Sequence, residues 1–269
     1  LMNQIRLAKI SDISEIMKFN EDNWKSNHIL ARDKSFFKYE HQNDAGVNFA
    51  ISIENNKING VLGFIKYSNI ASDIATVIWK ALKSKSNPML GIELLQFLRD
   101  HNDHNILFSL GVNKKTMGIY NYLDIHTGYL DHYIIINSKI HNFNILKIES
   151  NNHIKKMQFI EDSQYQFIQL DKNSFNPDSD SCFDFDFKNN KFIPRKDRDY
   201  FVKRFLNHPL YKYKVYGIYK ASLPSSLVVT RKVTIGDSSI LRIVDYTGND
   251  HDIVYFSKFL YQIMIDRDY

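Results

Sequence analysis

The chain has 269 residues, 43% hydrophobic and 14% aromatic, which is enough for two domains with packed cores and excludes an intrinsically disordered protein. Its formal net charge of +5 allows an anionic partner such as a nucleotide, although the excess of Lys, Asn and Ile is equally expected of an AT-rich genome. No basic run is interleaved with aromatic residues, which argues against a nucleic-acid partner.

The single cysteine, Cys182, excludes a disulfide framework and favours a reducing compartment, so we expect a cytoplasmic protein. It lies among acids in DSDSCFDFDF, which argues against a nucleophilic thiol. The ten His residues show no zinc spacing, and His208 has no Asp, Glu, His or Cys within five residues, so no metal is expected. No signal peptide opens the chain, and no apolar run has the roughly 18 residues of a membrane helix.

The first half of the chain predicts alternating strands and helices. Asp12 suits a helix N-cap, Asn55-Asn56 suits a hairpin turn, and Pro88 suits the first turn of a helix. The expected strands are 5–8, 47–54, 60–67, 73–82, 105–112 and 130–136, and the expected helices are 11–24, one from Asp33, one around 90–98 and 114–123. Hairpins combined with one helical crossover predict an α/β fold with a mixed β-sheet flanked by helices.

The region from about 137 to 196 is the least regular part of the sequence. DKNSFNPDSDSCFDFDFKNN is polar, acidic and interrupted by Pro177, so loops are expected there, with strand content at 166–170. We therefore expect a first domain at 1–138, a connection at 139–196 and a second domain at 197–269.

The second domain repeats the pattern of the first. The helical pattern SFFKYEHQ at Ser35 has a counterpart 165 residues later, YFVKRFLN at Tyr200. Three strand patterns have counterparts at the same offset: KVYGIY for FAISIE, SLVVTRK for VLGFIKY and SSILRIV for DIATVIW. The shared offset favours duplication over chance, with 255–265 as the second copy's crossover helix. About 35 residues that follow the first crossover helix have no counterpart, so either the second copy is truncated or the sequence stops before its end.

The stretch from Ser86 to Tyr120 combines a glycine-containing loop, a helix, a buried strand and a second helix that carries a tyrosine. Unpaired N–H groups at a helix N-terminus bind phosphate oxygens, and Gly91 at that position lets a phosphate approach the backbone closely. This order of elements is one known way to hold a pyrophosphate-containing cofactor and to place an acid beside it.

Residues 5–138 resemble the GNAT superfamily of acetyl-CoA-dependent N-acyltransferases, so the repeat predicts a tandem GNAT-like arrangement with a degenerate second copy. The family's phosphate loop reads Arg-Gly-x-Gly-x-Gly followed by x-x-Leu-Leu, and Leu94-Leu95 sets its register here. Of the loop only Gly91 is kept, and the arginine and the two earlier glycines are replaced by Ser86, Asn87 and Met89.

The second mark of the family is a strand-end Asn followed by Leu-Tyr and Gly-Phe. Asn113 and Tyr120 match this pattern, and Ile119 is a conservative replacement for the leucine. Asp124-Ile125 stands where the family has Gly-Phe.

The resemblance implies acetyl-CoA as co-substrate of the first domain, without a metal. The splayed end of strand 73–82 would pair with the pantetheine amides, and the first turn of the next helix would hold the pyrophosphate. The implied cofactor-binding residues are Trp79, Lys80, Ala81, Met89, Leu90, Gly91, Ile92 and Asn113. Tyr120 would protonate the leaving thiolate as general acid, whereas strand 73–82 offers no base beyond Asp73.

Simpler alternatives stay open for these residues. Gly91 also fits a helix-packing glycine, and Tyr120 fits a core residue of its helix. Asp245, at the end of an expected strand, fits either a substrate-facing acid or a loop cap before Gly248. Two acids in GNDHD, at the start of the second copy's helix, would repel a pyrophosphate, so the usual CoA binding is not expected there.

The expected function is transfer of an acetyl or other acyl group from acyl-CoA to the primary amine of a small molecule. By analogy with tandem GNAT enzymes of bacterial surface-polysaccharide biosynthesis, a nucleotide-linked amino sugar is one candidate acceptor. The alternatives are a GNAT-derived binding or structural protein without catalysis, and a tandem-GNAT aminoacyl transferase, which the lack of a basic RNA-binding stretch disfavours.

Overall fold

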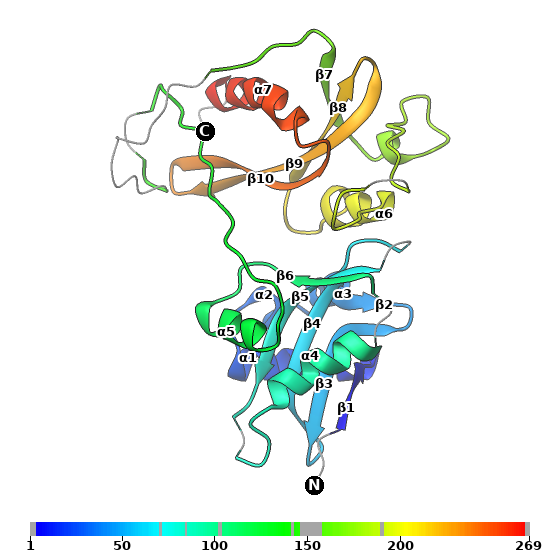
Figure 1. The fold of residues 1–269 in the computed structure, drawn as a ribbon, viewed down its shortest axis with the longest axis vertical. Coiled ribbons are helices and arrows are strands. Elements are labelled where there is room, and N and C mark those ends of the chain that lie inside the picture. The colour runs from blue at the N-terminus through cyan, green and yellow to red at the C-terminus, as the bar shows by residue number, and fades with distance from the viewer. Residues whose placement is uncertain are drawn as a thin grey trace. The chain divides into compact units, whose positions relative to one another are not determined.

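The computed structural model describes residues 4–69, 72–83, 85–101, 104–140, 143–145, 158–188 and 191–266. The chain divides into two units, Leu1–Gly128 and Tyr129–Tyr269 (Figure 1). In the part of the chain that the structure describes, no helix is both long enough and apolar enough to cross a bilayer.

The first unit is a β-sheet with helices on both faces. Its strands are β1 (Gln4–Ala8), β2 (Gln42–Asn43), β3 (Gly46–Glu54), β4 (Lys57–Lys66), β5 (Asp73–Ala81) and β6 (Ile106–Ser109). Its helices are α1 (Ile13–Asn23), α2 (Ile29–Arg32), α3 (Lys34–His41), α4 (Leu90–His101) and α5 (Lys114–Tyr122). The sheet order is β1-β3-β4-β5-β6, with β2 paired to β3. All neighbours are antiparallel except β5 and β6, which α4 connects in parallel, so the predicted α/β fold with a mixed sheet is confirmed.

Each face of this sheet has its own core. Ile16 of α1 and Phe37 of α3 pack on one face, and Leu94 of α4 and Tyr120 of α5 pack on the other (Figure 1). Burying such a side chain contributes roughly 1.5–3 kcal/mol. A Cβ atom at Gly60 would lie 2.8 Å from Leu94 Cδ1, so this glycine lets α4 pack directly on β4.

Two of the local signals act as the sequence predicts, whereas Asp12 makes no side-chain cap on α1 and Pro88 lies in the turn before α4, which begins at Leu90. Asp33 caps α3 by accepting a 2.9 Å hydrogen bond from the N–H of Phe36. Asn55 and Asn56 form the hairpin turn between β3 and β4 with φ of 51° and 58°, a left-handed conformation that asparagine tolerates. A 3₁₀ turn at Ile10–Asp12 leads into α1.

The second unit is a four-stranded antiparallel sheet with the order β10-β9-β8-β7. Its strands are β7 (Tyr165–Leu170), β8 (Tyr213–Lys220), β9 (Leu223–Ile235) and β10 (Ser238–Gly248). Its helices are α6 (Arg198–Phe201), which continues into a π-helical turn at Val202–Leu206, and α7 (Asp252–Asp266). Phe256 and Leu260 of α7 pack on one sheet face against Tyr216 and Val228. Because β7 pairs with β8, the predicted connection at 139–196 supplies a strand of this sheet.

The elements compared in the proposed repeat occur in the same order in both units. A helix, a three-stranded antiparallel meander and a longer helix are α3, β3–β5 and α4 in the first unit, and α6, β8–β10 and α7 in the second. In both meanders the pairing of the last two strands shifts register, near Thr76 in β5 and near Val244 in β10. Duplication itself stays a prediction.

Three details differ from the sequence-based expectations. No strand forms at 130–136, where Tyr129, Leu130 and Tyr133 are 84%, 83% and 88% exposed. The pattern there is typical of a strand, but a strand also requires a paired neighbour, and none of the described residues pairs with the outer edge of β6. β6 is shorter than the predicted 105–112, because the chain turns at Gly111 with φ of 68°. The short helix α2 was not predicted.

Candidate active site

The sheet of the first unit opens where β5 and β6 part. The two strands pair only from Asp73 opposite Ile106 to Thr76 opposite Ser109. β6 ends there, whereas β5 continues to Ala81 with β4 alone on its other side. Among the residues that the structure describes, no strand pairs with the second edge of β5 beyond Thr76. We call this opening the β5–β6 split.

A β-bulge in β5 follows directly on the point where its pairing with β6 ends. Thr76 lies opposite Phe64 and Trp79 opposite Leu62, so Val77 and Ile78 together oppose a single residue of β4. The extra residue bends the strand and changes which side chains face α4. Ile74 and Trp79 therefore pack in the same α4 and α5 core although they are five residues apart, and Ile78 lies in the core of the other face.

The backbone of β5 beyond the bulge can bind an extended chain. The N–H of Leu82 donates a 2.8 Å hydrogen bond to the carbonyl of Asn59, on the β4 side. Because backbone groups alternate along an antiparallel strand, Trp79 and Ala81 direct their N–H and C=O groups to the open edge. Such an edge pairs with an incoming segment that carries amides. Lys80 turns its backbone groups toward β4, with Val61 as its register partner.

The first turn of α4 lies beside this edge. Trp79 Nε1 donates a 3.0 Å hydrogen bond to the carbonyl of Gly91. A Cβ atom at Gly91 would lie 3.5 Å from that nitrogen and 3.9 Å from the Cβ of Ala81. The N–H groups of Leu90, Gly91 and Ile92 belong to the first turn, where they have no intrahelical partner. The predicted residues Trp79, Ala81 and Gly91 are thus brought together.

The loop before α4 uses its own side chains as a cap. Asn87 Oδ1 accepts a 3.2 Å hydrogen bond from the N–H of Met89, and Asn87 Nδ2 donates to Glu93 Oε2 at 2.8 Å. The side chain of Met89 is exposed. Glu93 places a carboxylate in the first turn, which suits the helix dipole but opposes a bound phosphate.

Tyr120 ends a chain of hydroxyl groups at the vertex of the split. Its hydroxyl lies 2.7 Å from Ser109 Oγ, which is hydrogen-bonded in turn to Thr76 Oγ1. Its ring is buried and stacks on Trp79, with ring centroids 5.7 Å apart. Ser109 and Thr76 are the last residues paired between β6 and β5. Connected hydroxyls can relay a proton, so this chain can pass one from solvent to a Tyr120 that has given its own away.

Sequence reasoning missed Ser109 and Thr76. The available signal was that Ser109 is a polar residue within the apolar run ILFSL, after which β6 ends. Thr76 lies in the middle of the apolar segment DIATVIW, and only the register of β5 against β6 brings it to Ser109.

Two further predicted residues have local structural roles. Asn113 is the exposed N-cap of α5, and its Oδ1 accepts a 3.0 Å hydrogen bond from the N–H of Thr116. It thereby fixes the start of the helix that carries Tyr120, and its part in cofactor binding stays a prediction. Asp73 is buried at the end of β5 that is far from the split. It is therefore not placed to act as the general base at the split. No group of three or more His, Cys, Asp and Glu side chains among the described residues is arranged for a metal ion.

In the second unit, the N-terminus of α7 is occupied by a side chain of the protein itself. Asp252, the first residue of α7, is fully buried and accepts hydrogen bonds from Ser225 Oγ, Ser226 Oγ and the hydroxyl of Tyr165, the last at 3.0 Å. Burial, together with this bond to Asp252, raises the pKa of Tyr165 to about 12. A carboxylate that occupies the helix N-terminus supports the expectation that the second unit does not bind a pyrophosphate there.

Asp245 fits neither of its two predicted roles. Its carboxylate is paired with Lys196 and accepts a 2.8 Å hydrogen bond from the hydroxyl of Tyr200. The side chains of Lys196 and Asp245 are only 8% and 9% exposed. The pair therefore joins the start of α6 to the bulge in β10, instead of capping the loop before Gly248.

No family model matches the chain, and no curated protein matches it in sequence. Its fold is similar to that of several solved structures. A GCN5-related N-acetyltransferase from Anabaena variabilis is 12% identical with a TM-score of 0.49, over 97% of this chain and 63% of that one. An aminoglycoside acetyltransferase from an uncultured soil sample is 10% identical with a TM-score of 0.39, over 51% and 99%. A ribosomal-protein-alanine N-acetyltransferase from Brucella melitensis is 11% identical with a TM-score of 0.36, over 51% and 99%.

Proposed function

We propose that the first unit is an N-acyltransferase that binds acyl-CoA, with acetyl-CoA as the expected form, in the β5–β6 split. The observation that supports this most is one continuous arrangement: an open strand edge, a helix N-terminus beside it and a tyrosine hydroxyl at its vertex. An acyl-CoA has matching parts in the same order, namely pantetheine amides, a pyrophosphate and a thioester.

The first turn of α4 would hold the pyrophosphate through the N–H groups of Leu90, Gly91 and Ile92. The open edge at Trp79 and Ala81 would pair with the amides of the pantetheine. This orientation leads the thioester toward the vertex of the split.

In the proposed reaction a neutral primary amine attacks the thioester carbonyl carbon, a C–N bond forms and the C–S bond breaks. The leaving thiolate takes the proton of the Tyr120 hydroxyl, and the tyrosinate regains one from solvent, with the Ser109 and Thr76 hydroxyls as a relay. The nitrogen releases its surplus proton to water. The amine therefore reacts as the free base, and turnover should rise with pH until the amine is deprotonated.

The acceptor is a small molecule with a primary amine, and a nucleotide-linked amino sugar remains our candidate by analogy of architecture. In the GNAT superfamily the first helices and surface loops build the acceptor pocket, so we expect it around residues 24–37, which contain α2 and the start of α3. Release of free CoA can be measured with a panel of amino-sugar nucleotides, amino acids and polyamines, and the acceptor is the compound that depends on Tyr120 for turnover.

Calorimetric titration of the full chain with acetyl-CoA and with CoA tests the first step. We expect binding of both, together with a higher melting temperature, because a ligand at 100 times its Kd stabilises the native state by about 2.7 kcal/mol. No heat and no shift with acetyl-CoA or longer acyl-CoAs would overturn the proposal.

One observation favours a second candidate, a binding module without catalysis. Asn87 and Glu93 satisfy the loop before α4 with the protein's own groups and place a negative charge where a phosphate would bind. This candidate predicts no CoA binding in the wild type. Under it, Glu93→Gln would create affinity, whereas under acyl transfer it would only strengthen affinity that already exists.

A further inference from the structure

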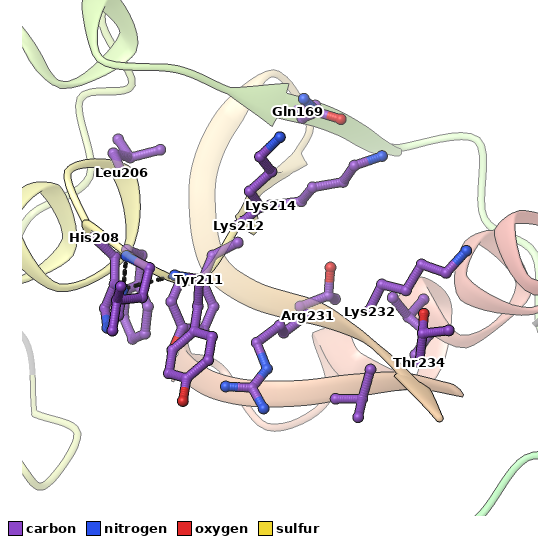
Figure 2. Close-up of a pocket in the computed structure, with 15 residues that line it drawn as sticks. Gln169, Leu206, His208, Tyr211, Lys212, Lys214, Arg231, Lys232 and Thr234 are labelled. Atoms are coloured by element: carbon purple, nitrogen blue, oxygen red, sulfur yellow. Dashed lines mark hydrogen bonds between the residues drawn. The ribbon is translucent and has the colours of Figure 1, made fainter. Parts of the chain in front are cut away.

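The second unit contains a hollow of about 840 Å³ at the start of β8 (Figure 2). β8 pairs with β9 only from Tyr213 opposite Arg231 onward. Among the described residues, the only strand that pairs with β9 beyond Arg231 is β10, as far as Ile235, so no second strand pairs with β9 at this end. The hollow therefore lies around this strand edge, where backbone groups as well as side chains can contact a ligand.

The charged side chains of this hollow have one sign. Lys212, Lys214, Arg231 and Lys232 line it, and none of the described residues in the lining is an Asp or Glu. The chain as a whole has 35 basic and 30 acidic residues, so composition does not explain a lining without acids. Among the described residues, Lys212, Lys214 and Arg231 form no ion pair with a carboxylate. Uncompensated cations around one concave surface favour an anionic ligand.

Arg231 is held in place by aromatic rings. Its guanidinium lies 4.3 Å from the ring centroid of Tyr211, and the ring of His208 stacks on the same tyrosine at 5.0 Å. His208 Nδ1 accepts a 2.9 Å hydrogen bond from the N–H of Tyr211, which fixes this turn. A stacked guanidinium keeps its N–H groups in its own plane, where a phosphate can be bound by two of them.

The basic groups lie on both sides of the strand edge. Arg231 is in register with Tyr213, whereas Lys214 is in register with Thr230, so the two cations project to opposite faces. Figure 2 shows Arg231 beside Tyr211 on one side and Lys214 on the side of Gln169. A single small anion contacts one side, so a ligand that contacts both sides needs more than one anionic group.

Thr230 supplies a second kind of observation. It lines the hollow, it is 1% exposed, and its Oγ1 has no hydrogen-bond partner among the described residues. An unsatisfied buried hydroxyl destabilises the fold, and a hydrogen bond to a ligand oxygen would offset that cost. Leu210, Val233 and Leu241 add apolar surface to the same lining, which suits a ligand with an organic part.

We propose that this hollow binds a small organic diphosphate or triphosphate. Single-stranded RNA fits the geometry less well, because stacking of its bases requires an open aromatic face. The Tyr211 ring is already in contact with the guanidinium of Arg231 and the ring of His208. The proposal does not depend on acyl transfer by the first unit.

Calorimetric titration of the full chain with ADP and with tripolyphosphate, at low and at physiological salt, tests it. We expect binding of both, at least tenfold weaker in Arg231→Ala and in Lys214→Ala. Arg231→Lys should recover only part of the affinity, because it keeps the charge and loses the planar group. Lys220→Ala is the matched control, since it removes a cation from the far end of β8, outside the hollow, and should leave the Kd unchanged.

The outcomes separate this site from the first unit. Equal weakening by Lys220→Ala and Arg231→Ala would show net charge alone and overturn the proposal, as would no binding at millimolar ligand. If Gly91→Ala loses ADP binding while Arg231→Ala keeps it, the phosphate is bound by the first unit, which would also overturn the proposal. A single-stranded RNA that binds more tightly than tripolyphosphate and equally well to Arg231→Ala would also contradict it. Circular dichroism confirms that each variant is folded.

Discussion

Trp79 and Gly91 are joined by a 3.0 Å hydrogen bond from the indole Nε1 to the backbone carbonyl. This bond ties the open end of β5 to the first turn of α4, so the strand edge and the helix N-terminus keep a fixed distance. A ligand that bridges them meets a preorganised site, which lowers the entropic cost of binding.

Gly91→Ala should weaken CoA binding without weakening the fold. The added methyl group has ordinary contact distances of 3.5 Å to Trp79 and 3.9 Å to Ala81, and alanine is the better helix former. The same methyl group lies between the edge and the helix turn, so we expect CoA affinity to fall about tenfold, or about 1.4 kcal/mol.

Gly118→Ala is the matched control for that variant. Gly118 is also helical, and a Cβ atom there would meet nothing within 4 Å. We expect it to raise stability by up to about 1 kcal/mol and to leave CoA affinity unchanged. If Gly91→Ala binds CoA as tightly as Gly118→Ala in calorimetry, the phosphate is not held by this turn.

Tyr120→Phe should lower turnover far more than CoA affinity. The variant keeps the ring that stacks on Trp79 and removes the hydroxyl bonded to Ser109. General acid catalysis contributes about 10²–10⁴-fold, and we expect kcat to fall by that order. Tyr122→Phe, at a tyrosine that is 77% exposed two residues away, is the control and should keep full activity. Equal kcat in the two variants would remove Tyr120 from the acid role.

The strands and helices that carry the candidate site could be predicted from the sequence, because their periods, and the spacing of Asn113 and Tyr120, are local patterns. The bulge at Val77 and Ile78 could not, because it exists only in the pairing of β5 with β4. For the same reason Thr76 was not connected to Tyr120, since the contact needs the register between two strands separated by a helix.

The same limit explains the wrong strand at 130–136 and the roles predicted for Asp245. The β-branched and aromatic residues of YLDHYIII are a local pattern, but a strand is completed by a neighbour that the sequence does not identify. The partner of Asp245 is Lys196, 49 residues earlier, so no window around either residue reveals a buried pair.

Breaking the Lys196–Asp245 pair should destabilise the second unit strongly. Lys196→Met leaves a buried carboxylate with Tyr200 as its remaining side-chain donor, and removing one partner of such a pair costs about 3–5 kcal/mol. Replacing both, as Lys196→Met with Asp245→Leu, should cost less than the single change. Denaturant unfolding measures both.

The ion pair between Lys258 and Glu161 is the control, because its side chains are 48% and 72% exposed. Lys258→Met should change the free energy of unfolding by no more than about 1 kcal/mol. If Lys196→Met is as mild as Lys258→Met, the buried pair does not hold α6 to β10.

Tyr165→Phe should change how stability depends on alkaline pH. Burial and the bond to Asp252 raise the pKa of Tyr165 from 10 to about 12, so the folded state retains a proton that the unfolded state loses. The stability that Tyr165 contributes is fully present below pH 10 and is lost as the pH rises to about 12. The difference in unfolding free energy between wild type and Tyr165→Phe should therefore be constant at neutral pH and shrink across that window. Urea unfolding at several pH values measures it, with the exposed Tyr129→Phe as control, and a constant difference from pH 7 to 12 would refute the assignment.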